Sequence, residues 1–558
     1  MTNNDKCVLA GCLLSLAAIS EVRAQDTFKY PGCADVTRND FTKVTVVDKL
    51  KDPSLDEPIR FAVAKDGAVY FAERNGVLKA AGADGSIRTL GKIQVNPTSD
   101  RLRISGNNEF GLVGLVLDPG FEYNHQLYVT YQPASPDVTN ISRFTLANGV
   151  LDPGSEKILL SWPVQKNYCC HTGGGMQFDA KGDLWLSVGN DTRNPGHGNV
   201  IGYVDETNPD ADDQGHAANT NDYRGKILRI HPTPDGKYTV PPGNLKEFYG
   251  SMWNASDLAL VKPEIYTMGH RNPYTLAVDD VQGLLAWGDV GPDDQWETEE
   301  LDIVERPGFM GWPYFAGAEG NAHYLYRLNK DPLAPKNASK NNTGVMNLPP
   351  ARGATVGYRQ SAAITGPIYR YTNNQTSPKK VPGHFDGKWF ATDFDAGWVH
   401  VLSLDNSGTV VTGTASLLTG LIRPLQITIG PDGILYILEY ATGYKFNPDG
   451  STTPGNGSDG VTRISRLEYK GQPCLVPNSL KDRMSARSVA AATGFVRLGF
   501  NGAHTVEMRS GSRGFQLFSL RGERVWKYRI SDASVKFVAR VSVPSAVEAG
   551  LYLVRFDD

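Results

Sequence analysis

The chain has 558 residues, with 56 Lys and Arg against 60 Asp and Glu, which gives a net charge of −4. This length exceeds one ordinary domain, and the balanced charge argues against a nucleic-acid-binding protein with a basic face. The 59 Gly and 34 Pro residues are typical of a turn-rich β protein. After the N-terminus, no apolar run reaches the roughly 18 residues of a membrane span, so no transmembrane segment is expected.

Residues 1–24 have the pattern of a secretory signal peptide. Lys6 precedes an apolar stretch, and Val22 and Ala24 put small residues just before the expected cleavage site. Leu9–Cys12 also has the form of a lipoprotein cleavage box, but most of the apolar region lies after it, whereas such a box should follow that region. We therefore expect a secreted protein, either extracellular or on the outer cell surface.

Four cysteines remain after removal of the signal, and export permits disulfides. Cys33 and Cys474 flank the main body, so a bridge between them would clasp its two ends. Cys169 and Cys170 are adjacent, and the sequence leaves open whether they form a strained vicinal disulfide or remain two thiols.

A hairpin pattern recurs along residues 25–470: an apolar strand, a turn with Asp or Gly, and a strand rich in aromatic and β-branched residues. Its copies begin at Phe61, Leu115, Met176, Leu276, His384 and Ile427. Six copies predict an all-β protein with a six-bladed β-propeller, and two stacked sandwiches are the alternative. The uneven spacing predicts long, functional loops chiefly in the third to fifth units. No sustained helical period occurs, so helices should be few.

The composition changes after the propeller. Residues 471–493 are polar and rich in Ala and Ser, which is typical of a linker. Residues 494–558 alternate apolar and polar positions, which predicts a small C-terminal β-sandwich of six or seven strands.

Three loops carry the candidate chemistry. In the first, three glycines follow His171. This predicts an accessible imidazole, suited to accept a proton near neutral pH, and a backbone that a flat ligand can approach closely. The alternative is a turn histidine beside a glycine bend.

In the second loop, Arg271 offers a planar fork for carboxylates, and Asn272 can both donate and accept hydrogen bonds. The alternative is an arginine that ties blades together.

The third loop runs from Gly288 to Asp294. A turn at Gly291 and Pro292 can present two carbonyl oxygens to a hard cation, and nearby carboxylates would strengthen the field. The alternative is an acidic, solvated loop. A further acidic run is expected to be mainly a solvated loop, with a second calcium site as its alternative; it comprises Asp205, Glu206, Asp210, Asp212 and Asp213.

Together these motifs resemble the soluble, quinone-dependent glucose/sorbosone dehydrogenases, which are six-bladed propellers that use pyrroloquinoline quinone (PQQ) and calcium. The similar stretches lie between about Phe61 and Leu467 and include FGLVGLVLDPGF, HTGGGMQFDAKGDLWLSVGN, GHRNPY and DVGPDD. The resemblance implies that His171 is the catalytic base, which removes the proton of the sugar C1 hydroxyl as hydride passes to the quinone. It implies that Arg271 and Asn272 contact the cofactor and the reacting oxygen.

The same resemblance implies that the main-chain carbonyls of Gly291 and Pro292 bind the calcium of the cofactor, which acts as a Lewis acid. Glu109 falls near a family glutamine at the cofactor edge, and Arg423 falls near arginines that hold cofactor carboxylates.

The sequence also departs from the family pattern. Asp395 stands where the family places a lysine against the cofactor, so it would repel a tricarboxylate unless calcium or Arg423 compensates. Asn190, with Asp191 beside it, stands where the family has the aspartate that orients the histidine. An amide can hold an imidazole but stabilises its charged form less than a carboxylate does.

These observations predict a secreted, PQQ-dependent dehydrogenase that oxidises an aldose or oligosaccharide at C1 to the lactone. No CxxCH haem motif occurs, so an external electron acceptor, a quinone or a cytochrome, is expected. Two alternatives stay open: a calcium-dependent propeller lactonase or other hydrolase, and a non-catalytic glycan-binding propeller.

The C-terminal segment resembles the sorting domains of type IX secretion in FQLFSLRGERVWK and GLYLVRF. This resemblance implies secretion machinery as a partner. A carbohydrate-binding or spacer domain is the alternative.

Overall fold

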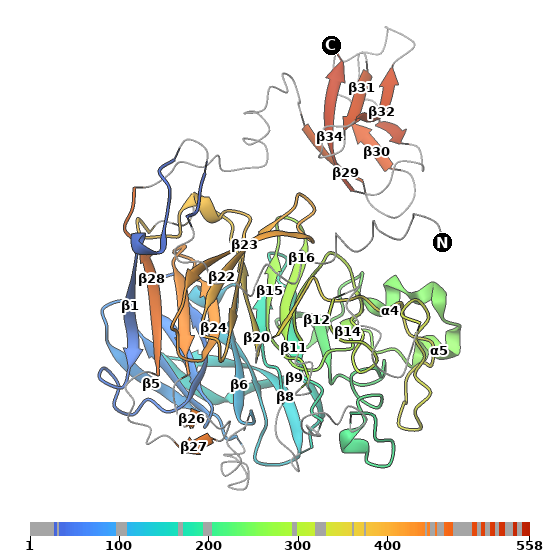
Figure 1. The fold of residues 1–558 in the computed structure, drawn as a ribbon. Coiled ribbons are helices and arrows are strands. Elements are labelled where there is room, and N and C mark those ends of the chain that lie inside the picture. Colours follow the sequence, from blue (N-terminus) through green and yellow to red (C-terminus); the bar gives the residue numbers. More distant parts are fainter. Residues whose placement is uncertain are drawn as a thin grey trace, which may run out of the picture. The chain divides into compact units, whose positions relative to one another are not determined.

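Six antiparallel β-sheets follow one another along the chain in the computed structural model (Figure 1). The described residues are 27–30, 33–95, 109–165, 171–192, 203–292, 298–318, 331–359, 362–372, 375, 377–440 and 462–472, with the backbone of eight further strands, β26, β27 and β29 to β34. We number the six sheets as blades 1 to 6 in chain order.

The first three blades each present their strands in sequence order. Blade 1 consists of β2 (Pro58–Val63), β3 (Val69–Glu73), β4 (Val77–Ala81) and β5 (Ile87–Lys92). Blade 2 consists of β6 (Leu112–Leu117), β7 (Gln126–Tyr131), β8 (Val138–Ala147) and β9 (Val150–Pro163). Blade 3 consists of β10 (Met176–Phe178), β11 (Leu184–Val188), β12 (Lys226–Pro232) and β14 (Ile265–Met268), with the two-residue strands β13 (Tyr238–Thr239) and β18 (Gly308–Phe309) at its margin.

The next two blades follow the same plan, and the last one combines both ends of the propeller chain. Blade 4 consists of β15 (Pro273–Asp279), β16 (Leu284–Asp289), β17 (Thr298–Val304) and β19 (Val356–Arg359). Blade 5 consists of β20 (Ala363–Ile368), β21 (Trp389–Asp393), β22 (Val399–Leu404) and β23 (Val411–Leu418). Blade 6 consists of β24 (Pro424–Ile429), β25 (Leu435–Glu439), β28 (Arg463–Tyr469) and β1 (Phe41–Asp48).

The first strands of the blades form a closed ring. Contacts join β2 to β6, β6 to β10, β10 to β15, β15 to β20, β20 to β24, and β24 back to β2. Closure of this ring confirms the predicted six-bladed propeller and rejects the two stacked sandwiches.

Adjacent blades pack on both faces of each second strand, so these strands are buried along most of their length rather than on alternate residues. All five residues of β3, β11, β21 and β25 are buried. One apolar cluster joins Leu78 and Leu90 of blade 1 to Leu112 and Phe144 of blade 2. The core therefore lies between blades, in successive layers around the ring.

The fifth sequence repeat differs in phase from the others. The copy at His384 covers β21 and β22, the second and third strands of blade 5, whereas the other copies cover first and second strands. Any two adjacent strands of a blade satisfy the same hairpin pattern, so the pattern alone does not identify the inner strand.

Helices in the described residues are few and short, as predicted. The α-helices are α3 (Phe121–Asn124), α4 (Leu245–Phe248) and α5 (Ala255–Ala259). The 3-10 helices are η1 (Arg38–Asp40), η3 (Pro209–Ala211), η4 (Gly250–Met252) and η5 (Gly383–Phe385). None of these helices, within the described ranges, is long and apolar enough to span a membrane.

The chain divides into two compact units, the first ending at Cys474 and the second running from Leu475 to Asp558. In the second unit, one sheet has the order β29-β34-β31-β32 and another pairs β30 with β33. Its strands are β29 (Gly494–Leu498), β30 (His504–Glu507), β31 (Gly514–Phe518), β32 (Arg524–Arg529), β33 (Arg540–Val543) and β34 (Gly550–Asp557). A small hairpin in the first unit pairs β26 (Tyr444–Phe446) with β27 (Thr452–Pro454).

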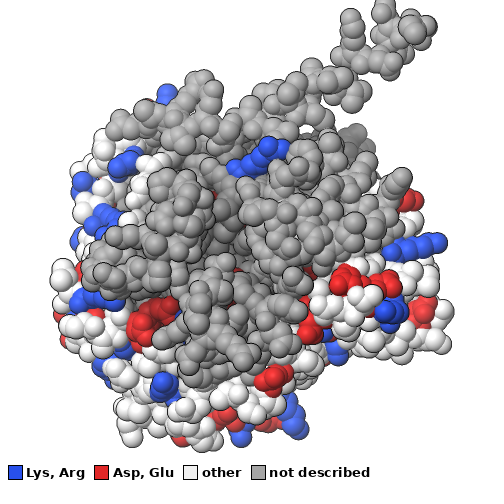
Figure 2. Space-filling model, turned by 60° about the horizontal axis from the view of Figure 1, so that its bottom comes forward, with Lys and Arg blue, Asp and Glu red and all other residues white. Residues whose placement is uncertain are grey.

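Several expectations fall outside the described residues: the signal peptide 1–24, the linker beyond residue 472 and the pair Cys169–Cys170. Cys33 is disulfide-bonded, and its expected partner, Cys474, is among the residues not described. On the face shown in Figure 2, the described Lys and Arg side chains are interspersed with Asp and Glu, in keeping with the nearly balanced charge.

Ring closure depends on β1, which pairs antiparallel with β28. Glu439 of β25 is fully buried and lies 2.9 Å from Lys43 Nζ and 2.7 Å from Arg463 Nε, so one carboxylate ties three strands of blade 6 together. Burial alone would raise its pKa, but the hydrogen bonds from Arg463 and Lys43 outweigh burial and hold the pKa below its usual value.

We predict that Glu439→Gln destabilises the propeller by about 1–3 kcal/mol, because the two cations lose their carboxylate partner. Thermal melting measures the effect. The control Asp235→Asn removes a partner from the exposed pair Asp235–Lys237 and should change the melting midpoint little. Equal midpoints for the two variants would contradict this role of Glu439.

Candidate active site

The candidate residues lie at one edge of the propeller because the first two strands of each blade run in opposite directions. An inner strand begins where the second strand of its blade ends, so both termini lie at one edge of the propeller. Glu109 and His171 precede the inner strands β6 and β10, and Asn190 follows β11. Arg271 and Asn272 directly precede β15, and Gly291 follows β16. Three consecutive blades thus supply the site.

The loop that carries His171 packs tightly against these strands. His171 has φ +66°, a left-handed conformation that few non-glycine residues adopt. A Cβ on Gly173 would lie 2.6 Å from the Ser187 carbonyl oxygen, and one on Gly174 would lie 2.5 Å from that of Val113. The glycines therefore bring the loop close to neighbouring strands, whereas the sequence predicted close approach of a flat ligand.

His171 itself is 5% exposed, so the prediction of an accessible imidazole was wrong. Burial lowers its pKa well below the usual value, and the positive charge of Arg271 lowers it further. The ring is therefore neutral at neutral pH. A neutral ring holds the lone pair that a proton acceptor needs.

Glu109 links the histidine loop to blade 4. Its carboxylate accepts hydrogen bonds from the backbone N–H groups of His171, at 3.0 Å, and of Thr172, at 3.1 Å. The Asn272 side-chain amide donates to it at 3.2 Å. Burial raises the pKa of Glu109 despite these donors.

Asp289 fixes the backbone of the loop that carries Arg271 and Asn272. Its two oxygens accept from the N–H of Arg271 at 3.1 Å and from that of Asn272 at 2.6 Å. Asn272 Oδ1 in turn accepts from Gly173 N–H at 3.2 Å, so the two predicted loops touch directly. The Arg271 guanidinium donates to the Val290 carbonyl at 3.0 Å.

Arg271 also lies over the ring of Tyr203, 5.7 Å from the centroid, and is 2% exposed. It therefore does tie separate loops together, as its alternative proposed, while placing a positive charge next to His171. The two interpretations are compatible.

The expected metal ligands Gly291 and Pro292 follow β16 at the same edge. Gly291 N–H donates to Glu299 Oε2 at 3.2 Å, and Glu299 also accepts from Ala363 N–H at 2.8 Å. Among the described residues, no group of three or more His, Cys, Asp or Glu could hold a metal ion. Glu299 thus ties the Gly291 turn to the start of blade 5 through two backbone amides.

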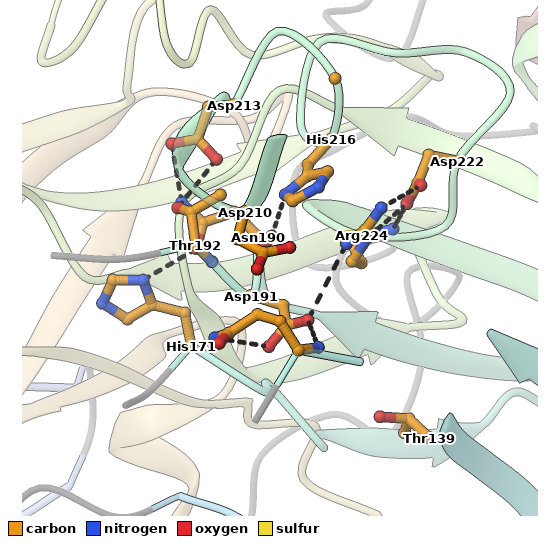
Figure 3. A network of polar contacts seen from close by, with 12 residues as sticks. Thr139, His171, Asn190, Asp191, Thr192, Asp210, Asp213, His216, Asp222 and Arg224 are labelled. Atoms are coloured by element: carbon orange, nitrogen blue, oxygen red, sulfur yellow. Dashed lines mark hydrogen bonds and ion pairs between the residues drawn. The ribbon is translucent and has the colours of Figure 1, made fainter. Parts of the chain in front are cut away.

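Asn190 lies where the resemblance placed it. Its Oδ1 is 2.8 Å from His171 Nδ1, as Figure 3 shows. Asp191 does not take over this role: its carboxylate accepts from Gln165 N–H at 2.9 Å and lies 3.9 Å from Arg224. Asn190 is thus the orienting group for the imidazole.

The acidic run contains a residue of this site that the sequence analysis did not assign. Asp212 and Asp213 are fully buried, so the expected solvated loop was wrong for these two positions. Asp213 accepts from the Asn190 amide at 2.9 Å, directly behind the imidazole. A sequence signal was absent, because the two residues lie 23 positions apart in the chain and nothing local distinguishes Asp213 from its acidic neighbours.

Arg423 does not take part in the contacts described above around His171. It lies beside Asp395 and Phe394. Its Nε is 3.7 Å from Asp395 Oδ1, and its guanidinium lies 5.6 Å from the Phe394 ring centroid. The compensation of Asp395 by Arg423 that the sequence required is therefore present.

The fold agrees with the comparisons to known proteins. The family model for glucose/sorbosone dehydrogenases matches residues 55–445, and the chain belongs to this family. Quinoprotein glucose dehydrogenase B of Acinetobacter calcoaceticus is 25% identical over 289 residues, which are 49% of this chain and 53% of that protein, about half its length. Aldose sugar dehydrogenase YliI of Escherichia coli K12 is 22% identical over 407 residues, 70% of this chain and 89% of that protein.

Solved structures show the same fold. A putative oxidoreductase (glucose dehydrogenase) from Thermus thermophilus has a TM-score of 0.51 at 22% identity and covers 76% of this chain and 99% of its own. The apo-form of the soluble aldose sugar dehydrogenase from Escherichia coli has a TM-score of 0.51 at 19% identity, with coverages of 77% and 99%.

We predict that wild-type protein loses about 1 kcal/mol of stability relative to His171→Asn between pH 6.5 and pH 5.5. The pKa of His171 is lowered in the folded state, so below pH 6.5 the unfolded chain binds a proton that the folded chain does not. Asparagine tolerates the left-handed backbone and does not titrate. Urea denaturation across this range measures the difference, and a constant difference would contradict a buried, neutral His171.

Proposed function

We propose that the chain is a secreted quinoprotein that oxidises an aldose, free or at the end of an oligosaccharide, at C1 to the lactone. The observation that carries this proposal is the buried His171, whose Nδ1 lies 2.8 Å from Asn190 Oδ1 and whose loop is hydrogen-bonded to Asn272. Membership of the glucose/sorbosone dehydrogenase family and similarity to a quinoprotein glucose dehydrogenase support it.

The residues at this edge fit an anionic, planar quinone such as PQQ. Arg271 is a cation in a buried setting, and Asn272 offers an amide beside it. The two acids at positions where the family has other residues each have partners: Glu109 accepts hydrogen bonds from His171, Thr172 and Asn272, and Asp395 is paired with Arg423. Gly291 and Pro292 would hold calcium through their carbonyl oxygens.

Bound PQQ with calcium would supply the two-electron acceptor for the C1 hydride. The task of His171 is to take the proton of the C1 hydroxyl on Nε2, because Nδ1 is engaged with Asn190 at 2.8 Å. Asn272 holds the histidine loop through Gly173 and Glu109, so the base keeps its position as it changes charge. Burial lowers the pKa of the resting imidazole, and the charge of Arg271 lowers it further.

The hydrolase alternative has less support. Propeller lactonases use acidic and amide side chains that converge on a metal, whereas the family to which this chain belongs is that of the glucose/sorbosone dehydrogenases. A silent glycan-binding propeller would give no reason for a buried histidine with an oriented ring.

Secretion is part of the proposal and rests on the signal-peptide pattern of residues 1–24. We further propose that the strands from Gly494 to Asp557 form a sorting domain for type IX secretion machinery, on the resemblance of their sequence. Electrons would leave to an external quinone or cytochrome.

The test is a titration of purified protein with PQQ, with and without calcium, followed by aldoses and a dye acceptor. We predict stoichiometric, calcium-dependent binding of PQQ and sugar-dependent dye reduction.

His171→Ala should retain PQQ binding and lose turnover by about 100-fold or more, because only the base is removed. His231→Ala is the matched control, since this histidine pairs with Asp183 in blade 3, away from the site. No binding at micromolar PQQ, or full turnover of His171→Ala, would contradict the proposal.

A further inference from the structure

Asp213 occupies the position behind Asn190, on the side away from His171 (Figure 3). Its Oδ2 accepts from the Trp312 indole N–H at 2.6 Å and from Asn190 Nδ2 at 2.9 Å. Its Oδ1 accepts from the Thr192 hydroxyl at 3.0 Å. The carboxylate thus takes three hydrogen bonds from three side chains.

The chemistry of Trp312 and Asn190 fixes the direction of their two bonds. An indole N–H and an amide NH₂ are donors only, so they require acceptor oxygens on Asp213. Asn190 therefore turns its NH₂ to Asp213 and its Oδ1 to His171. The backbone N–H of Thr192 adds a weaker constraint, since it lies 3.4 Å from the same Oδ1.

The orientation of this amide decides the tautomer of the histidine. Because Asn190 Oδ1 can only accept, the Nδ1 of His171 that faces it must carry the hydrogen. The lone pair of the ring is then on Nε2. With the amide turned over, its NH₂ would face Nδ1, the hydrogen would move to Nε2, and the ring could not accept a hydroxyl proton there.

The surroundings hold this chain of bonds rigid and dry. Asn190, Thr192 and Asp213 are all at or near zero exposure. Asn190 is also tied through its backbone, since its N–H donates to the Arg271 carbonyl at 2.8 Å and its carbonyl oxygen is 3.1 Å from His216 Nδ1. With water excluded, a buried polar contact of this kind is costly to break.

We propose that Asp213 is the positioning residue of the base: through Asn190 it selects the Nδ1–H tautomer of His171 and supports the ring when it becomes positively charged. This inference rests on the proposed function for its catalytic meaning. In a direct histidine–aspartate pair the carboxylate contacts the imidazole itself. In this chain Asn190 lies between the Asp213 carboxylate and the His171 ring.

The charged groups that act on Asp213 and His171 come from several elements. Arg271 lowers the pKa of both, and Lys226 of β12 also interacts with Asp213. Burial raises the pKa of Asp213 to about 7, so pH 8 is a suitable condition in which to compare variants with the carboxylate ionised.

The first readout needs no cofactor: ¹⁵N NMR of histidine-labelled protein at pH 8 distinguishes the protonated from the bare ring nitrogen, and His171→Asn identifies the signal. We expect wild type to show hydrogen on Nδ1. Asp213→Ala removes every acceptor, so it should give a mixture of tautomers. Asp213→Asn keeps an acceptor oxygen for Trp312 and Asn190, so it should retain the wild-type tautomer.

The second readout is turnover of the PQQ-loaded protein. Asp213→Ala should lower kcat by about 10-fold with little change in KM for the sugar, because only part of the protein then holds the active tautomer, and Asp213→Asn should recover much of this loss. The matched control is Asp212→Ala, which removes an equally buried neighbour bonded to Ser339 and Asn341 and should change neither tautomer nor kcat.

Hydrogen on Nε2 in wild type, or a wild-type tautomer in Asp213→Ala, would overturn the inference. If Asp213→Ala fails to fold, Asn190→Asp/Asp213→Ala decides: a direct carboxylate at residue 190 should restore the Nδ1–H tautomer, and failure to do so in a folded protein would contradict the relay. Failure of PQQ binding would overturn the proposed function alone, because the tautomer is read without cofactor.

Discussion

Closure of the inner ring is the constraint on which the rest of the structure depends. The chain returns to its own beginning when β1 pairs with β28 in blade 6, and the buried Glu439 joins Lys43 and Arg463 at this seam. Since the ring fixes where each inner strand begins, loops from blades 2, 3 and 4 meet at one edge although the chain between Glu109 and Gly291 is long. The site is thus a consequence of the propeller and requires no local motif that spans it.

Burial governs the chemistry of that edge. Desolvation keeps His171 neutral and raises the pKa values of Glu109 and Asp213. Each of these groups is bonded to backbone amides, to a side-chain amide or to an indole, so its position is set before any ligand binds. Such preorganisation is what proton transfer at a fixed atom requires.

Much of this arrangement could be predicted from the sequence. The hairpin repeats predict the six blades because each repeat is a local pattern of strand, turn and strand, and the motifs around His171, Arg271 and Gly291 predict the loops that meet. The phase of the fifth repeat could not be predicted, since any two adjacent strands of a blade have the same pattern. The packing role of Gly173 and Gly174 was also hidden, because close approach to a strand and to a ligand demand the same residue.

Asp213 shows a different limit of sequence reasoning. Its acidic neighbours made a solvated loop the natural expectation, and only the folded loop reveals that the carboxylate is turned inward onto Asn190 and Trp312. The same structure shows how an asparagine at residue 190 is held beside the imidazole of residue 171: its NH₂ group donates to Asp213 from behind. A departure from the family pattern at one position is therefore matched by a buried carboxylate at another.

The most direct test of the account is the reduction of PQQ-loaded protein by an aldose in a single turnover, compared with the same sugar deuterated at C1. The account predicts that the quinone spectrum changes on mixing and that the deuterated sugar reacts more slowly, because the C1–H bond breaks as His171 takes the hydroxyl proton. A loaded protein that no aldose reduces, or equal rates for the two sugars at saturation, would contradict it.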